Sequence, residues 1–145
     1  MREVRLLIAD DDPDMRSWLR EVLEARGARV AEADSGVDLL RVLSDEGPFD
    51  LVVSDVRMSW ASGVQVLAMV RAAGYEIPFI VITAYADATV RASVDQLGAV
   101  LVEKPFEIEQ LVEAAEAILP PWVSGQVGSS PGLKEPLRAS AWRDT

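Results

Sequence analysis

Short apolar runs alternate with segments of helical periodicity along the first 120 residues, and this alternation constrains the fold most strongly. Between Met15 and Arg26, for example, apolar residues recur three and four positions apart, which is typical of an amphipathic helix. Strands that alternate with helices predict a parallel sheet with helices on both faces. The predicted strands are Arg5–Ala9, Arg29–Ala33, Leu51–Ser54, Phe79–Ile82 and Val100–Val102, and the predicted helices are Met15–Arg26, Val37–Leu43, Val64–Ala73, Ala88–Leu97 and Glu107–Leu119.

Polar residues with distinct chemistry follow four of these predicted strands. Asp10 and Asp11 follow the first strand, and Asp55 follows the third. Thr83 comes after the fourth strand and Lys104 after the fifth. Because ligands bind beyond the carboxyl ends of strands in open parallel sheets, we expect these side chains to form one site.

Several carboxylates in one small site need a compensating cation. Two unit charges about 4 Å apart repel by roughly 4 kcal/mol at an effective dielectric constant near 20. Oxygen ligands favour Mg²⁺, which binds one or two carboxylates together with water and phosphate. A carboxylate is also a competent nucleophile toward phosphorus. The cluster therefore predicts magnesium-assisted phosphoryl transfer, with Lys104 as a second cation and Thr83 as a hydroxyl donor.

The composition excludes several other classes of function. The chain contains no cysteine and no histidine, which removes disulfides, thiolate metal sites and Ser-His or Cys-His nucleophile pairs. Its net charge of −10 disfavours binding to nucleic acids and to anionic membranes. No apolar run is long enough to span a membrane and Met1–Ala9 does not resemble a signal peptide, so we expect a cytoplasmic protein.

Four sequence motifs, in order and each at a strand end, resemble those of the bacterial response-regulator receiver domain. They are LLIADDDPDMRSWL, LVVSDVRMSWASG, FIVITA and EKPF, and the resemblance extends from about Arg5 to Leu119. It implies a flavodoxin-like (βα)5 fold with strand order 2-1-3-4-5, an order for which the chemotaxis receiver is a known example.

The resemblance also implies a role for each site residue. Asp55 matches the phosphoacceptor, and Asp10 and Asp11 match the acidic pair that holds Mg²⁺. Arg57 matches the position whose backbone carbonyl binds the metal. Thr83 matches the switch hydroxyl and Lys104 the lysine that contacts phosphate, with a cis bond to Pro105.

The family implies a partner histidine kinase or phosphotransfer protein as the phosphoryl donor, followed by hydrolysis of the acyl phosphate by the domain itself. We expect no other enzymatic activity. We expect a receiver domain over residues 1–120 and a flexible tail rich in Gly, Ser and Pro over residues 121–145. Such a single-domain regulator, a monomer or weak dimer, is expected to contact a downstream protein through its last helix and strand.

Two departures from the family pattern concern how a signal leaves the site. Leu101 stands three positions before Lys104, where the family usually has an aromatic residue, and the preceding loop is one residue shorter. Tyr85, two residues after Thr83, is a candidate substitute for that aromatic group. Arg57 and Tyr85 also occupy positions that tune the lifetime of the acyl phosphate, so we predict slow autodephosphorylation.

Two alternatives stay open from the sequence alone. The first is a pseudo-receiver, a binding module that works without phosphorylation, because Leu101 and the short loop alter the expected switch. The second is a phosphatase of the haloacid-dehalogenase type, for which Asp10 and Asp12 have the right spacing. That enzyme class is disfavoured because Asp14 stands where a hydroxylic residue is usual and because the chain is short.

Overall fold

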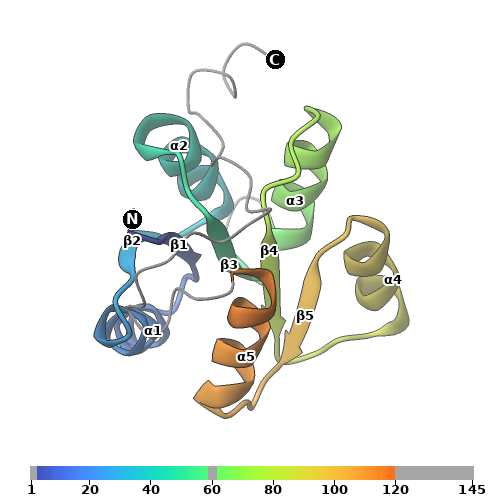
Figure 1. The fold of residues 1–145 in the computed structure, drawn as a ribbon. Coiled ribbons are helices and arrows are strands. Elements are labelled where there is room, and N and C mark those ends of the chain that lie inside the picture. Colours follow the sequence, from blue (N-terminus) through green and yellow to red (C-terminus); the bar gives the residue numbers. More distant parts are fainter. Residues whose placement is uncertain (1–2, 59–61, 120–145) are drawn as a thin grey trace.

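The computed structural model describes residues 3–58 and 62–119. They form one five-stranded parallel sheet in the order β2-β1-β3-β4-β5 (Figure 1). The predicted strand order and the strict alternation of strands with helices are therefore confirmed. The strands are β1 Arg5–Ala9, β2 Arg29–Ala33, β3 Leu51–Asp55, β4 Phe79–Thr83 and β5 Val100–Glu103; the helices are α1 Pro13–Ala25, α2 Gly36–Glu46, α3 Gly63–Ala72, α4 Ala88–Gln96 and α5 Ile108–Ile118.

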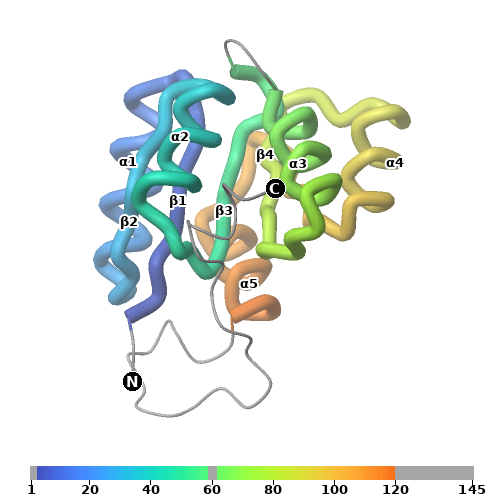
Figure 2. The backbone as a smooth tube through the Cα atoms, turned by 90° about the horizontal axis from the view of Figure 1, so that it is seen from above, coloured from blue at the N-terminus to red at the C-terminus, as the bar shows by residue number. Residues whose placement is uncertain are grey.

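Two apolar clusters cover the two faces of the sheet and create three layers. Alternate residues of a strand point to opposite faces, so Leu6 and Leu7 belong to different clusters. The face that contains Leu6 packs against α1 and α5, and the face that contains Leu7 packs against α2, α3 and α4 (Figure 1 and Figure 2). With both faces covered, β3 and β4 are buried along their whole length.

Helices α1, α2 and α3 begin one or two residues earlier than their apolar periodicity predicts, because polar caps define the starts, whereas α4 begins at Ala88 as predicted and α5 begins one residue late. The Asp12 side chain accepts a hydrogen bond from the Asp14 amide, and Pro13 occupies the first turn of α1. A capping box between Ser62 and Gln65 starts α3 at Gly63 in the same way. At the other end, Gly27 and Gly98 adopt positive φ angles just after α1 and α4, which end within one residue of the prediction, whereas α2 continues three residues past the predicted Leu43 to Glu46.

The strand register brings the expected site residues to one edge of the sheet. Ala9 pairs with Ser54 and Asp55 pairs with Ile82, so β1, β3 and β4 end at similar heights. The Lys104 amide donates to the Thr83 carbonyl over 2.8 Å and extends this alignment to β5. The Lys104–Pro105 bond is cis, as the resemblance implies, and the Gly47–Pro48 bond is also cis.

The predicted C-terminal tail is not tested by this fold. The proposed tail, residues 121–145, and with it the boundary near residue 120, lie outside the described residues. None of the helices in the described part of the chain is long and apolar enough to cross a membrane.

Candidate functional site

Lys104 connects two buried carboxylates at the carboxyl edge of the sheet. Its Nζ lies 2.6 Å from Oδ2 of Asp55 and 3.7 Å from Oδ2 of Asp10. Asp10 is 2% exposed and Asp55 is 8% exposed, so water screens neither carboxylate well. Three of the residues predicted from the sequence thus meet in one acidic site that is formed by the ends of β1, β3 and β5.

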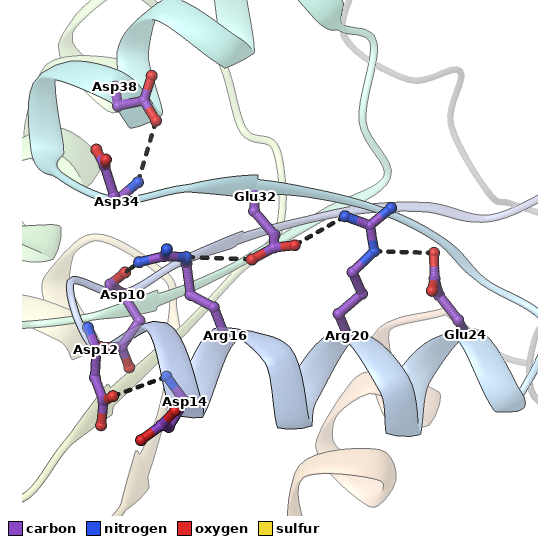
Figure 3. Close-up of polar contacts among 9 residues, drawn as sticks. All are labelled: Asp10, Asp12, Asp14, Arg16, Arg20, Glu24, Glu32, Asp34 and Asp38. Atoms are coloured by element: carbon purple, nitrogen blue, oxygen red, sulfur yellow. Dashed lines mark hydrogen bonds and ion pairs between the residues drawn. The ribbon is translucent and has the colours of Figure 1, made fainter.

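Asp10 is held through its amide, its carbonyl and its carboxylate. The Asp10 amide donates to the carbonyl of Ala33 at the end of β2 over 3.1 Å. Oδ1 of Asp10 accepts a hydrogen bond from the Asp12 amide over 2.9 Å. The Asp10 carbonyl accepts from Nη1 of Arg16 on α1 over 2.7 Å (Figure 3). The loop that carries the first carboxylate is therefore fixed from β2 and from α1.

Asp55 is fixed by the loop that follows it and by α3. Its Oδ1 accepts a hydrogen bond from the Arg57 amide over 2.9 Å, which places Arg57 directly beside the site. Gly63, at the start of α3, approaches the Asp55 backbone closely, and its amide donates to the Val56 carbonyl over 3.1 Å. Oδ2 of Asp55 faces Lys104, so a different cation or donor engages each carboxylate oxygen.

The electrostatics of the site favour an additional cation. Burial raises the pKa of Asp10 to about 6, and the charge of Asp55 adds to this rise. Burial alone lowers the pKa of Lys104, but the hydrogen bonds to Asp55 and Asp10 and the charges of these two carboxylates together outweigh burial and raise the pKa above its usual value. With both carboxylates ionised, one lysine leaves a negative charge uncompensated in a poorly screened site.

This arrangement fits Mg²⁺. Among residues 3–58 and 62–119, no three acidic side chains converge closely enough to hold a metal ion by themselves, and Asp11 is exposed. Mg²⁺ does not require such a cage, because it keeps several waters and binds one or two carboxylates. Asp10 and Asp55 would supply those carboxylates, with Asp11 and the Arg57 carbonyl as the further expected ligands.

Thr83 reaches the same edge of the sheet, but its hydroxyl is engaged elsewhere. Oγ1 of Thr83 donates to the Tyr85 carbonyl and accepts from the Tyr85 amide, each over 3.1 Å. The Thr83 side chain is buried, whereas Tyr85 is 67% exposed. Leu101 pairs with Val81 and packs, partly buried, against the cluster on the α2, α3 and α4 face.

Sequence reasoning missed two residues of this site, Gly63 and Arg16. A Cβ atom on Gly63 would lie 2.4 Å from the Asp55 carbonyl oxygen, so only glycine fits there. The sequence feature that could have indicated Gly63 is its position as the last residue of the LVVSDVRMSWASG motif. Arg16 gave no local signal, because its partners Asp10 and Glu32 lie on two other elements.

Comparison with known proteins identifies the family. Residues 6–116 match the family model of the response regulator receiver domain. The chain belongs to the response regulator receiver family. It is 35% identical over 117 residues to response regulator MprA of Mycobacterium sp. (strain KMS), a match that covers 80% of this chain and 50% of that protein. Response regulator MprA of Mycobacterium ulcerans (strain Agy99) is 34% identical over 117 residues, and this match also covers 80% of this chain and 50% of that protein. The chain thus spans about half the length of the curated relatives it matches.

Solved receiver structures agree with this membership. The non-phosphorylated HemR receiver domain of Leptospira biflexa has a TM-score of 0.74 and 29% identity, and covers 81% of this chain and 95% of its own. A response regulator receiver protein of Pseudomonas putida matches with a TM-score of 0.76 and 25% identity, and the match covers 81% of this chain and 98% of that protein. Receiver domains are signalling modules of two-component systems that interact with histidine kinases and effectors, and the family normally uses Mg²⁺ at its phosphorylation site.

Replacing Asp10 by asparagine is expected to stabilise the metal-free receiver domain at high pH. A folded-state pKa near 6, above the value of about 4 for an unfolded chain, gives stability that is present below pH 4 and lost as the pH rises through 6. Asp10→Asn removes this loss but keeps an acceptor for the Asp12 amide. In urea unfolding with a chelator, we expect a gain of about 3 kcal/mol at pH 8 that shrinks toward pH 4.

Asp95→Asn on the exposed face of α4 is the matched control, and it is expected to show no comparable pH-dependent gain. A gain for Asp10→Asn that is equal at pH 8 and pH 4 would show that ionisation of Asp10 is not its cause.

Gly63→Ala is expected to destabilise the domain by about 1–3 kcal/mol, because the new methyl group overlaps the Asp55 carbonyl and the Ser54 hydroxyl. Denaturant unfolding measures this loss. The control is Ala68→Ser on the exposed face of α3, which is expected to change stability by only a few tenths of a kcal/mol. Equal stability of Gly63→Ala and the wild type would contradict the close approach.

Proposed function

We propose that this chain accepts a phosphoryl group on Asp55 from a histidine kinase or phosphotransfer protein, in a Mg²⁺-dependent reaction, and thereby switches its protein contacts. The observation that supports this most directly is the 2.6 Å contact between Lys104 and Asp55 beside the buried Asp10. Asp55 is buried at a strand end, and it faces a lysine and a second carboxylate. This environment is what a phosphoacceptor needs, and an ordinary surface acid does not require it.

The proposed chemistry is an in-line transfer. A carboxylate oxygen of Asp55 attacks phosphorus, the bond from phosphorus to the donor's imidazole nitrogen breaks, and the imidazole leaves with the electron pair and takes up a proton. Mg²⁺, when bound, offsets the charge on the phosphoryl oxygens. Lys104 exchanges its contact with Asp55 for one with a phosphoryl oxygen, and the Thr83 hydroxyl donates to another after it releases the Tyr85 carbonyl.

The proposed output surface is formed by α5 and β5. Lys104 and Pro105 connect the acidic site directly to both elements, so a change at Lys104 is transmitted along the chain to either side. The second candidate function is the pseudo-receiver, and the observation that favours it is Leu101, which places an aliphatic side chain in β5 where an aromatic switch residue is usual.

Labelling with a small acyl phosphate distinguishes the two functions. We expect Mg²⁺-dependent incorporation of one phosphoryl group into the wild-type protein and none into Asp55→Asn. The control Asp50→Asn changes another buried aspartate, which lies just before the opposite end of β3 and accepts from the Arg5 amide. It is expected to be labelled normally. Labelling of Asp55→Asn at the wild-type level would contradict Asp55 as the phosphoacceptor. No labelling of the folded wild type would support the pseudo-receiver.

Arg57 and Tyr85 are expected to prolong the acyl phosphate. Both residues are exposed and follow the strand ends that carry Asp55 and Thr83, so their side chains can hinder an attacking water. Arg57→Asn combined with Tyr85→Glu is expected to accelerate loss of phosphate on the order of tenfold, which corresponds to about 1.4 kcal/mol in the barrier.

The measurement is phosphate release after removal of the donor. Arg41→Asn, which alters an exposed arginine on α2, is the control and is expected to leave the lifetime unchanged. An unchanged lifetime in the double variant would contradict a shielding role for Arg57 and Tyr85.

A further inference from the structure

Arg16 connects the first carboxylate of the site to the edge strand of the sheet. Its Nη1 donates to the Asp10 carbonyl over 2.7 Å, and its Nε donates to Oε1 of Glu32 on β2 over 3.2 Å. Figure 3 shows the Arg16 side chain rising from α1 between these two acceptors. The side chain is 19% exposed, so it lies largely beneath the surface.

Glu32 is itself held in position by a second arginine. Its Oε2 accepts from Nη1 of Arg20 over 2.8 Å, and Nε of Arg20 contacts Glu24 over 3.3 Å (Figure 3). The hydrogen bond from Arg20 lowers the pKa of Glu32, which keeps this carboxylate ionised. Charged hydrogen bonds thus connect Arg20 to Glu32, Glu32 to Arg16, and Arg16 to the Asp10 carbonyl. Hydrogen bonds with a charged partner are stronger than neutral ones.

The position of the Asp10 carboxylate depends on this contact. The Asp10 amide is fixed by the Ala33 carbonyl, and its carbonyl is fixed by Arg16. Together these bonds set the peptide units on both sides of Asp10, and therefore the direction of its Cα–Cβ bond. Loss of the Arg16 bond frees the peptide unit between Asp10 and Asp11, the two acids expected to bind the metal.

We propose that Arg16 is a positioning residue that sets the Mg²⁺ affinity of the acidic site through the Asp10 carbonyl, and that Glu32 keeps Arg16 in place. This inference rests on the function proposed above. Arg16 touches neither phosphoacceptor nor phosphoryl group, so its effect passes through Asp10 and Asp11. Partners that orient metal ligands typically change metal affinity by about 10- to 100-fold when they are removed.

Calorimetric titration of the unphosphorylated protein with Mg²⁺ tests the proposal without measuring phosphorylation. Arg16→Met keeps much of the aliphatic stem but removes every donor, and it is expected to weaken Mg²⁺ binding about tenfold. Arg16→Lys keeps the charge but cannot reach both acceptors in the same fork-like geometry, so we expect an intermediate loss. Because Glu32 acts through Arg16, combining Glu32→Gln with Arg16→Met is expected to weaken binding no further than Arg16→Met alone.

Arg41→Met is the matched control, since Arg41 pairs with Asp38 on α2 and has no contact with Asp10; its Mg²⁺ affinity is expected to stay within twofold of wild type. The rate of phosphorylation provides a second readout. The deficit of Arg16→Met is expected at low Mg²⁺ and is expected to disappear once Mg²⁺ saturates the variant. A purely structural role would lower the melting temperature without this dependence on Mg²⁺.

The outcomes separate this inference from the proposed function. If the wild type binds Mg²⁺ and Arg16→Met binds it with the same affinity, the inference is overturned and the proposed function stays intact. Folded wild-type protein that binds no Mg²⁺ would overturn both. Weakened binding in Arg16→Met but not in Arg41→Met supports the positioning role.

Discussion

The contact of Lys104 with two buried carboxylates is the interaction on which the rest of the site depends. Asp10 and Asp55 come from adjacent strands, and the register of β1 and β3 brings them together whether or not a cation is present. Their repulsion is a cost that the hydrophobic clusters on both faces of the sheet must offset. One lysine cannot neutralise both charges, and burial together with the charge of Asp55 raises the pKa of Asp10. The rigid sheet thus holds a site that is ready for a further positive charge.

The repulsion between Asp10 and Asp55 explains why the loops around the site contain so many specific contacts. Asp10 is fixed by Ala33, Asp12 and Arg16, and Asp55 is fixed by Arg57 and by the close approach of Gly63. Without such restraints, the carboxylates would relieve their repulsion by rotating toward solvent. The residues that hold the site are therefore as much a part of its chemistry as the residues that would touch phosphate.

The alternation of strands with helices and the acidic site could be predicted because both depend on short-range patterns, whereas the strand order was implied by the resemblance to the receiver family. Apolar runs locate the strands, and parallel strands place residues such as Asp55 and Lys104 at one edge. The apolar periodicity placed the starts of α1 and α3 one or two residues late, because the caps Asp12 and Ser62 lie outside it. Arg16 was not predictable, since its bonds join α1 to β2 and depend on the angle at which α1 crosses the sheet. Gly63 required knowledge of how closely α3 approaches β3.

The hydrogen bonds of Thr83 suggest how phosphorylation could reach the surface although Leu101 is not aromatic. Its hydroxyl has a single proton, and that proton is donated to the Tyr85 carbonyl. Donation to a phosphoryl group on Asp55 therefore requires that the Tyr85 carbonyl lose its partner, and the loop between β4 and α4 must then find another arrangement. This step needs no aromatic side chain at Leu101, because the constraint acts through the backbone of Tyr85. The exposed ring of Tyr85 would then report the change at the surface, beside the start of α4.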